Sequence, residues 1–132
     1  YAHKYYNAIG LGIDFTARDV QQKLKEAGLP WEISKSFDGS TVVGNFLPKD
    51  NFTNIQNIQF SLEKNGEIVQ QGNTKDMLFS IDEIISYVSQ FFTLKIGDLI
   101  YTGTPAGVSK VSSGDQLKGY LEDNQLFDIK VL

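Results

Sequence analysis

The ten residues Gly12-Ile13-Asp14-Phe15-Thr16-Ala17-Arg18-Asp19-Val20-Gln21 predict the end of a strand that runs directly into a helix. Leu11, Ile13 and Phe15 alternate with small or polar residues, which is the period of a half-buried strand. Asp14 therefore projects from the face opposite to these apolar neighbours, at the last strand position. A fold that joins a strand end to a helix start in this way aims several charged groups at one point.

Thr16 is the expected N-cap of the helix that follows, with Asp19 three residues later as in a capping box. Its apolar residues fall at helical spacing: Val20, Leu24 and Ala27. Gly28 is a plausible stop after the last turn. Asp19 is explained by capping and by the helix dipole. Asp14 has no capping role, and the local pattern leaves two interpretations open, an ordinary turn residue or a functional acid.

Composition limits the function classes. The chain has 132 residues, 41% of them hydrophobic, which suits one domain with a core of its own. A formal charge of −4 argues against a nucleic-acid partner and against an anionic membrane surface. There is no cysteine, and His3 is the only histidine, which argues against thiolate or His-rich metal sites and a Ser-His-Asp triad. No apolar run approaches the ~20 residues of a transmembrane helix, and no signal peptide is visible, so we expect a soluble cytoplasmic protein.

Lys35 shares an odd-numbered register with three apolar residues, Trp31, Ile33 and Phe37, which predicts a short extended segment. Two interpretations of Lys35 remain open: a loop lysine that reaches water, or a partly desolvated amine that polarises a carbonyl or carboxylate. The stretch 38–51 is expected to be a loop that contains a short apolar run at residues 42–46.

Further along the chain, Asn65-Gly66 between alternating segments predicts a β-hairpin, and residues 120–132 predict a second one around Glu122. Ser80 to Glu83 is a capping box for a helix with an expected buried stripe: Ile81, Ile84, Ile85, Val88, and Phe91 or Phe92. Residues 99–101 predict a short buried strand. It ends in the turn 102–107, whose exposed backbone N–H groups could hold an anion. Strands dominate without regular βαβ alternation, so the fold class is mixed α+β, mostly β.

Four groups of segments, in order over nearly the whole chain, resemble one known family: residues 12–21; residues 28–31 with 35–38; residues 65–67 with 74–77; and residues 97–98 with 102–108. The chain resembles the C-terminal catalytic domain of the fumarylacetoacetate hydrolase family. It is most similar to the short, single-domain acylpyruvate hydrolases, oxaloacetate decarboxylases and homoprotocatechuate-pathway isomerases. The resemblance implies one catalytic domain over residues 1–132, a mixed β-roll or β-sandwich with two short inserted helices.

The resemblance also implies a metal site and its chemistry. In the family, three carboxylates bind a divalent ion, usually Mg²⁺ and in some members Mn²⁺ or Ca²⁺, and Asp14 matches one of them. Oxygen ligands suit such a hard cation. The ion acts as a Lewis acid on the enolate that forms when a C–C bond beside a carbonyl breaks. Lys35 matches the active-site lysine, Arg18 and Gln21 match residues that orient acid groups and water, and Thr104 matches a residue at the substrate carboxylate.

The sequence departs from the family pattern at the two other metal ligands. In the family, a Glu-x-Glu pair lies upstream of the Asp14 strand, as do the histidine and glutamate that activate water. No two glutamates of this chain have the Glu-x-Glu spacing. We therefore expect an N-terminal segment upstream of Tyr1, without which residues 1–132 are inactive.

The resemblance implies a homodimeric enzyme that cleaves a C–C bond in a small β-diketo or oxo acid. The alternatives are an isomerase of the homoprotocatechuate pathway and a non-catalytic binding domain that has lost its metal site.

Overall fold

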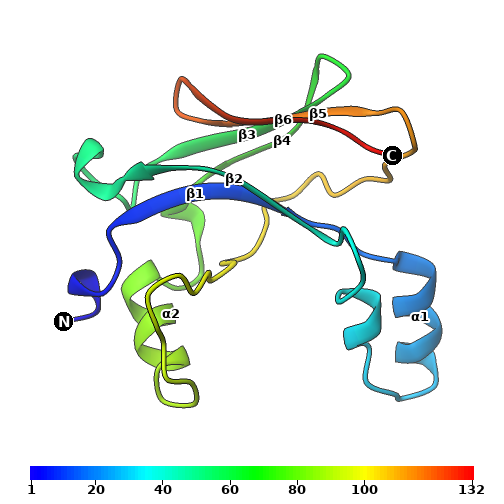
Figure 1. The fold of residues 1–132 in the computed structure, drawn as a ribbon, viewed down its shortest axis with the longest axis horizontal. Coiled ribbons are helices and arrows are strands. Elements are labelled where there is room, and N and C mark those ends of the chain that lie inside the picture. Colours follow the sequence, from blue (N-terminus) through cyan, green and yellow to red (C-terminus); the bar gives the residue numbers. More distant parts are fainter.

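The computed structural model describes residues 1–132 and has six strands and two α-helices (Figure 1). In chain order these are β1 (Ala8–Asp14), α1 (Arg18–Glu26), β2 (Thr41–Pro48), β3 (Gln59–Lys64), β4 (Glu67–Asn73), α2 (Ile81–Val88), β5 (Gln116–Leu121) and β6 (Asn124–Lys130). Single turns of 3-10 helix occur at Ala2–Lys4, Glu32–Ser34, Lys49–Asn51 and Thr74–Asp76. The predicted α+β, mostly β class is confirmed. Neither α-helix is long and apolar enough to cross a membrane.

The strands form two antiparallel sheets. β1 and β2 make a two-stranded ribbon, and the other four strands form a sheet in the order β4-β3-β5-β6. Figure 1 shows the ribbon between this sheet and the two α-helices, which lie on its opposite side near its two ends. In the ribbon, Asp14 pairs with Thr41, so the last residue of β1 lies beside the first residue of β2.

The core lies between the ribbon and the four-stranded sheet. Ile9 and Leu11 of β1 pack against a buried cluster of Ile58, Leu121 and Leu126. Because side chains alternate along a strand, Gly12 and Asp14 face away from this core, toward the helices. The predicted alternation and the position of Asp14 at the strand end are therefore confirmed.

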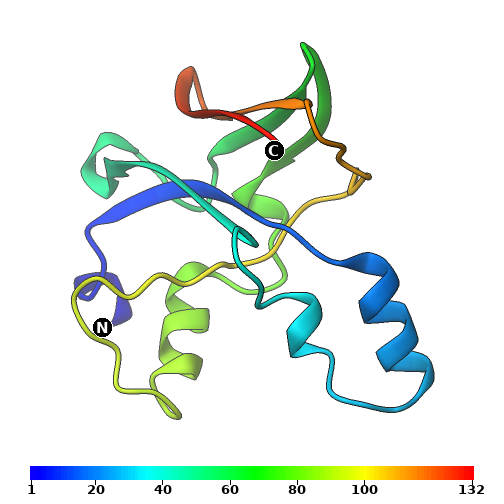
Figure 2. The same cartoon turned by 45° about the vertical axis from the view of Figure 1, so that its right-hand side comes forward.

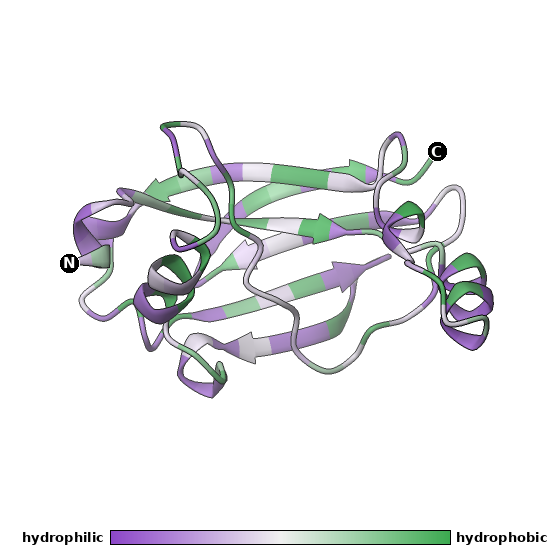
Figure 3. Cartoon of the chain, turned by 90° about the horizontal axis from the view of Figure 1, so that it is seen from below, coloured by the Kyte–Doolittle hydropathy of each residue, from purple (hydrophilic) through white to green (hydrophobic).

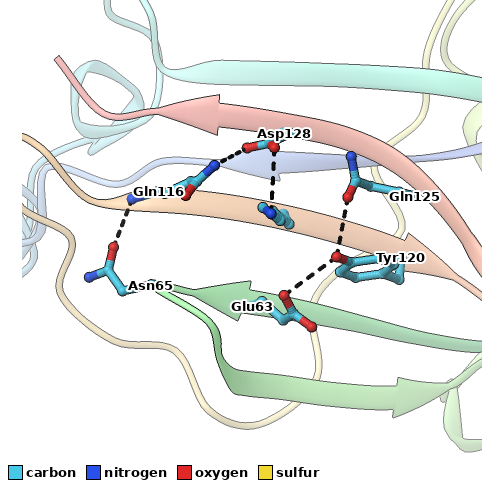
Figure 4. A network of polar contacts seen from close by, with 7 residues as sticks. Glu63, Asn65, Gln116, Tyr120, Gln125 and Asp128 are labelled. Atoms are coloured by element: carbon cyan, nitrogen blue, oxygen red, sulfur yellow. Dashed lines mark hydrogen bonds and ion pairs between the residues drawn. The ribbon is translucent and has the colours of Figure 1, made fainter.

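Both predicted hairpins are present. Asn65 and Gly66 have φ values of 54° and 86°, as a type I′ turn requires, and join β3 to β4. β5 and β6 form the second hairpin, around Glu122. Figure 4 shows polar side chains linked across β3, β5 and β6: Glu63, Asn65, Gln116, Tyr120, Gln125 and Asp128. Among these links, Gln116 Nε2 donates to Asp128 Oδ1 at 2.8 Å. This face of the sheet is polar, and the site residues lie elsewhere.

Two predictions for residues 31–48 are wrong. The apolar run within the expected loop is part of β2, because β1 supplies an antiparallel partner along almost its whole length. The expected extended segment is instead a turn, Glu32–Ser34. Ser34 is buried, and its hydroxyl donates to the Trp31 carbonyl at 2.5 Å, which closes the turn locally. A hydroxyl that bonds to nearby backbone competes with extended structure.

The start of α1 also differs from the prediction. The N-cap residue is Ala17 rather than Thr16, and no side chain caps the helix. The Ala17 N–H instead donates to the Ser34 carbonyl at 2.9 Å, so a contact from a distant turn fixes the start of the helix. Gly28, with φ of 66°, ends the helix as predicted. Leu29 N–H bonds to the Leu24 carbonyl, which completes a Schellman motif.

The capping box of α2 is confirmed, but its buried stripe is not. Ser80 and Glu83 bond reciprocally, yet no residue of α2 is fully buried, and Phe91 and Phe92 are 66% and 67% exposed. The strand predicted at residues 99–101 is also absent. Figure 3 shows the segment after α2 crossing the strands as an irregular chain. Large apolar side chains are exposed along it, as at Ile96 and Leu99, because no neighbouring element packs against them.

Candidate active site at the end of β1

An ion pair forms the centre of the candidate site. Lys35 Nζ lies 2.8 Å from Asp14 Oδ2, and the two side chains are 32% and 47% exposed. Two backbone hydrogen bonds bring the segments together: Phe15 N–H donates to the Ser40 carbonyl, and Ala17 N–H donates to that of Ser34. Lys35 directly follows the Glu32–Ser34 turn, so this turn aims its amine at Asp14. Lys35 is thus neither fully solvated nor fully buried.

A second polar pair lies on the first turns of α1. Arg18 Nη1 donates to Gln21 Oε1 at 3.0 Å, and the Gln21 side chain is buried with 5% exposure. No acidic side chain lies within ion-pair distance of Arg18. Because an Arg guanidinium has five N–H donors, most of them remain available to an acid group of a ligand. The hydrogen bond thus ties one end of the Arg18 guanidinium to a buried side chain.

Thr104 is held by the four-stranded sheet. Gln70 Nε2, on β4, donates to Thr104 Oγ1 at 2.9 Å and to the Pro105 carbonyl at 3.1 Å. No hydrogen bond or ion pair connects Thr104 to Asp14, Lys35, Arg18 or Gln21. The structure therefore brings the first four predicted site residues together as two pairs at the β1–α1 junction, and holds Thr104 from the β4 side.

Tyr101 is a neighbour of Asp14 that the sequence pattern did not indicate. Its hydroxyl donates to the Val42 carbonyl at 2.5 Å, on the strand that pairs with β1. Burial, and then the negative charge of Asp14, raise the pKa of the Tyr101 hydroxyl. The only signal for this contact in the sequence is Gly12, two residues before Asp14 and on the same face of β1. A Cβ at that position would collide with the tyrosine hydroxyl.

The residues present do not make a complete divalent-metal site. Asp14 offers one carboxylate, already paired with Lys35. Residues 1–132 contain no group of three or more His, Cys, Asp or Glu side chains placed to hold an ion. Mg²⁺ and Ca²⁺ are held by several oxygen ligands, so Asp14 can contribute to such a site but cannot form it alone.

Fold and site together define a mixed α+β domain with an acid–lysine pair where its first strand ends. The profile described as "Fumarylacetoacetate (FAA) hydrolase C-terminal" matches residues 2–131, and the chain belongs to this family. It is 41% identical over 131 residues to the mitochondrial oxaloacetate tautomerase of Caenorhabditis elegans, covering 98% of this chain and 61% of that protein. It is 51% identical over 109 residues to an oxaloacetate tautomerase of Escherichia coli, covering 82% and 50%.

A solved structure of a similar protein has the same fold. The crystal structure of fumarylpyruvate hydrolase from Pseudomonas aeruginosa, in complex with Mn²⁺ and pyruvate, superposes with a TM-score of 0.90 at 35% identity. The match covers 99% of this chain and 56% of that one. The chain thus spans between half and about three fifths of the length of these relatives.

Proposed function

We propose that the protein carrying this chain is an enzyme that acts on a small 2-oxo acid of the oxaloacetate or acylpyruvate type through an enolate. The observation that carries the proposal is the Lys35–Asp14 ion pair at the end of β1, beside an arginine without an acidic partner. The names of the relatives support it, because they describe enzymes of oxaloacetate and fumarylpyruvate, and one structure holds pyruvate and Mn²⁺.

Lys35 is the proposed catalytic residue. Its ammonium group donates hydrogen bonds to the substrate carbonyl oxygen, where negative charge develops as the enolate forms. A donor fixed in place before the reaction stabilises this charge without reorganising, and half-burial strengthens the interaction. Asp14 holds the ammonium in position from the strand end.

Arg18, Gln21 and Thr104 are the proposed substrate-binding residues. A guanidinium binds a carboxylate through two parallel hydrogen bonds, and Gln21 fixes the plane of this fork. The Thr104 hydroxyl, which already accepts a hydrogen bond from Gln70, donates its own proton to a second oxygen of the acid. Together with Lys35 they would hold an anion and a carbonyl in one orientation.

Metal dependence is part of the proposal, with Mg²⁺ as the expected ion and Mn²⁺ or Ca²⁺ as substitutes. Asp14 would supply one carboxylate, and the family resemblance predicts two glutamates upstream in the gene. The chemistry assigned above rests on Lys35, Arg18, Gln21 and Thr104, because residues 1–132 do not hold a full ligand set. Reading the gene upstream of Tyr1 tests the ligand prediction: an absent Glu-x-Glu pair favours a non-catalytic binding domain.

The experiment that tests the function uses the full-length protein with Mg²⁺ and two substrates, oxaloacetate and an acylpyruvate. Three reactions pass through an enolate and differ in product. A tautomerase makes the ultraviolet absorbance of enol oxaloacetate decay. A decarboxylase releases CO₂ and pyruvate, and a hydrolase releases pyruvate and a free acid. If the protein turns over neither of the two substrates, the proposal is contradicted. Activity only on a homoprotocatechuate-pathway intermediate supports the isomerase alternative.

We also propose a homodimer in the cytoplasm. Many large apolar side chains are exposed, among them Phe46, Leu78 and Phe79, and such surface favours association with further polypeptide. Light scattering of the full-length protein measures its mass and tests the dimer. Cell fractionation tests the compartment, since the Caenorhabditis relative is named as mitochondrial.

A further inference from the structure

The turn Thr102–Gly107 lies in a segment without secondary structure of its own. No residue from 99 to 111 makes a backbone–backbone hydrogen bond or belongs to a helix or strand. Figures 1 and 2 show this segment leaving α2 and passing along the helix side of the β1–β2 ribbon. Because backbone pairing does not fix its position, side-chain contacts must do so.

One anchor of the turn is on the four-stranded sheet. Gln70 donates to both Thr104 and Pro105, and Pro105 packs close to Gly72 of β4. Gly107, with φ of 99°, lies against the Val69 carbonyl, where a side chain would not fit. This end of the turn is thus held on β4.

The other anchor is Tyr101, on the ribbon. Its ring lies over Gly12, and its hydroxyl bonds to the Val42 carbonyl at 2.5 Å. Gly12 and Asp14 share a face of β1, so the ring crosses the strand on the face that carries Asp14. The raised pKa of Tyr101 agrees with this placement, because the Asp14 charge contributes to it. The turn therefore spans from the candidate site to β4.

We propose that Tyr101 is a positioning residue: its hydrogen bond to Val42, made across the bare backbone of Gly12, holds the Thr102–Gly107 turn beside Asp14 so that Thr104 meets the substrate acid. The statement that Thr104 meets the substrate acid rests on the proposed function. The part that concerns the turn rests on the contacts alone, since Tyr101 is the only side chain of the segment bonded to the ribbon.

Tyr101→Phe in the full-length protein tests the proposal, because it keeps the ring and removes the hydroxyl. We expect KM for the oxo acid to rise about tenfold, the effect of losing one hydrogen bond, with kcat nearly unchanged. Tyr87→Phe is the matched control, because Tyr87 is exposed and its hydroxyl has no hydrogen-bond partner. General destabilisation would instead reduce the active fraction, and so kcat, and leave KM unchanged.

A second readout is independent of turnover. We expect the NMR order parameters of the Thr102 and Thr104 methyl groups to fall in Tyr101→Phe and to stay unchanged in Tyr87→Phe. If the order parameters are unchanged in Tyr101→Phe, the proposal is overturned, even if the protein turns over no substrate. A wild-type protein without activity counts against the proposed function alone. Lower order parameters with an unchanged KM in an active enzyme overturn the positioning role of Tyr101.

Discussion

Lys35 and Asp14 are 21 positions apart in the sequence, yet Lys35 Nζ and Asp14 Oδ2 lie 2.8 Å apart at the end of β1. A metal ion bound by Asp14 would share the carboxylate with this ammonium group, whose positive charge opposes that of the ion. We therefore expect the two side chains to have opposite effects on metal affinity, although the proposed reaction uses both.

The first prediction follows from that competition. In calorimetric titrations of the full-length protein with Mn²⁺, Asp14→Asn raises the dissociation constant by more than about tenfold, because a charged ligand is lost. Lys35→Met leaves the affinity equal or tighter, because the competing cation is gone. Lys23→Met, an exposed lysine on α1, is the control. Equal weakening by the Asp14 and Lys35 variants would show that the pair only supports the fold.

The second prediction concerns Arg18. Arg18→Ala raises KM for oxaloacetate by about 10-fold to 100-fold in steady-state kinetics, with a smaller effect on kcat, because a charge-assisted hydrogen-bonded pair is lost. Arg18→Lys should restore little of the affinity lost in Arg18→Ala, because an ammonium group cannot form the two parallel hydrogen bonds. If the lysine variant restores the full affinity, charge alone binds the acid, and the buried Gln21 has no orienting role.

The third prediction concerns the β3–β4 hairpin. Gly66 has a φ of 86°, which strains any residue with a Cβ. Gly66→Ala should lower the free energy of unfolding by about 1–2 kcal/mol in urea denaturation. Glu67→Ala, at the exposed neighbouring position, should change it little. The Asp14–Lys35 pair lies on the other sheet, and Gln70, which holds Thr104, lies farther along β4 than the turn, so KM should not move. A change in KM would mean that the hairpin is coupled to the site.

The fourth prediction concerns the capping box of α2. Ser80→Ala should cost about 1 kcal/mol of stability, the usual value of an N-cap. The hydrogen bonds that Glu83 accepts from Ser80 lower the pKa of its carboxyl group. The stability from Glu83 is therefore complete above its unfolded-state pKa and is lost as the pH falls through the lowered, folded-state value. Urea titrations of wild type and Glu83→Gln should differ at neutral pH and converge in acid; a constant difference would contradict this.

Local signals predicted the parts of the fold that local chemistry determines. Asn65-Gly66 specified a hairpin, Ser80 with Glu83 specified a helix start, and Gly28 specified a helix end, because each motif satisfies its own backbone groups. The predictions were wrong where a residue far away in the sequence determines the local structure. β2 is a strand because β1 pairs with it, and α1 begins at Ala17 because Ser34 accepts its N–H.

The same limit applies to the candidate site. Asp14 could be placed on the polar face of its strand from the alternation alone, and the structure confirms that face. The partner of Asp14 could not be found in this way, because the Glu32–Ser34 turn that delivers Lys35 was predicted to be extended. Tyr101 was missed because its only signal is the glycine at position 12, and a glycine within a strand equally marks a bulge or a tight bend.

The rate of oxo-acid turnover in the full-length protein tests the central claim most directly. With Mg²⁺ and equal amounts of folded protein, the wild type should convert oxaloacetate or an acylpyruvate. Lys35→Met should be slower by about 100-fold, because it loses the donor at the developing negative charge. Equal rates for the two proteins, or no conversion of either substrate by the wild type, would contradict the assignment of Lys35 and Asp14 as the centre of the site.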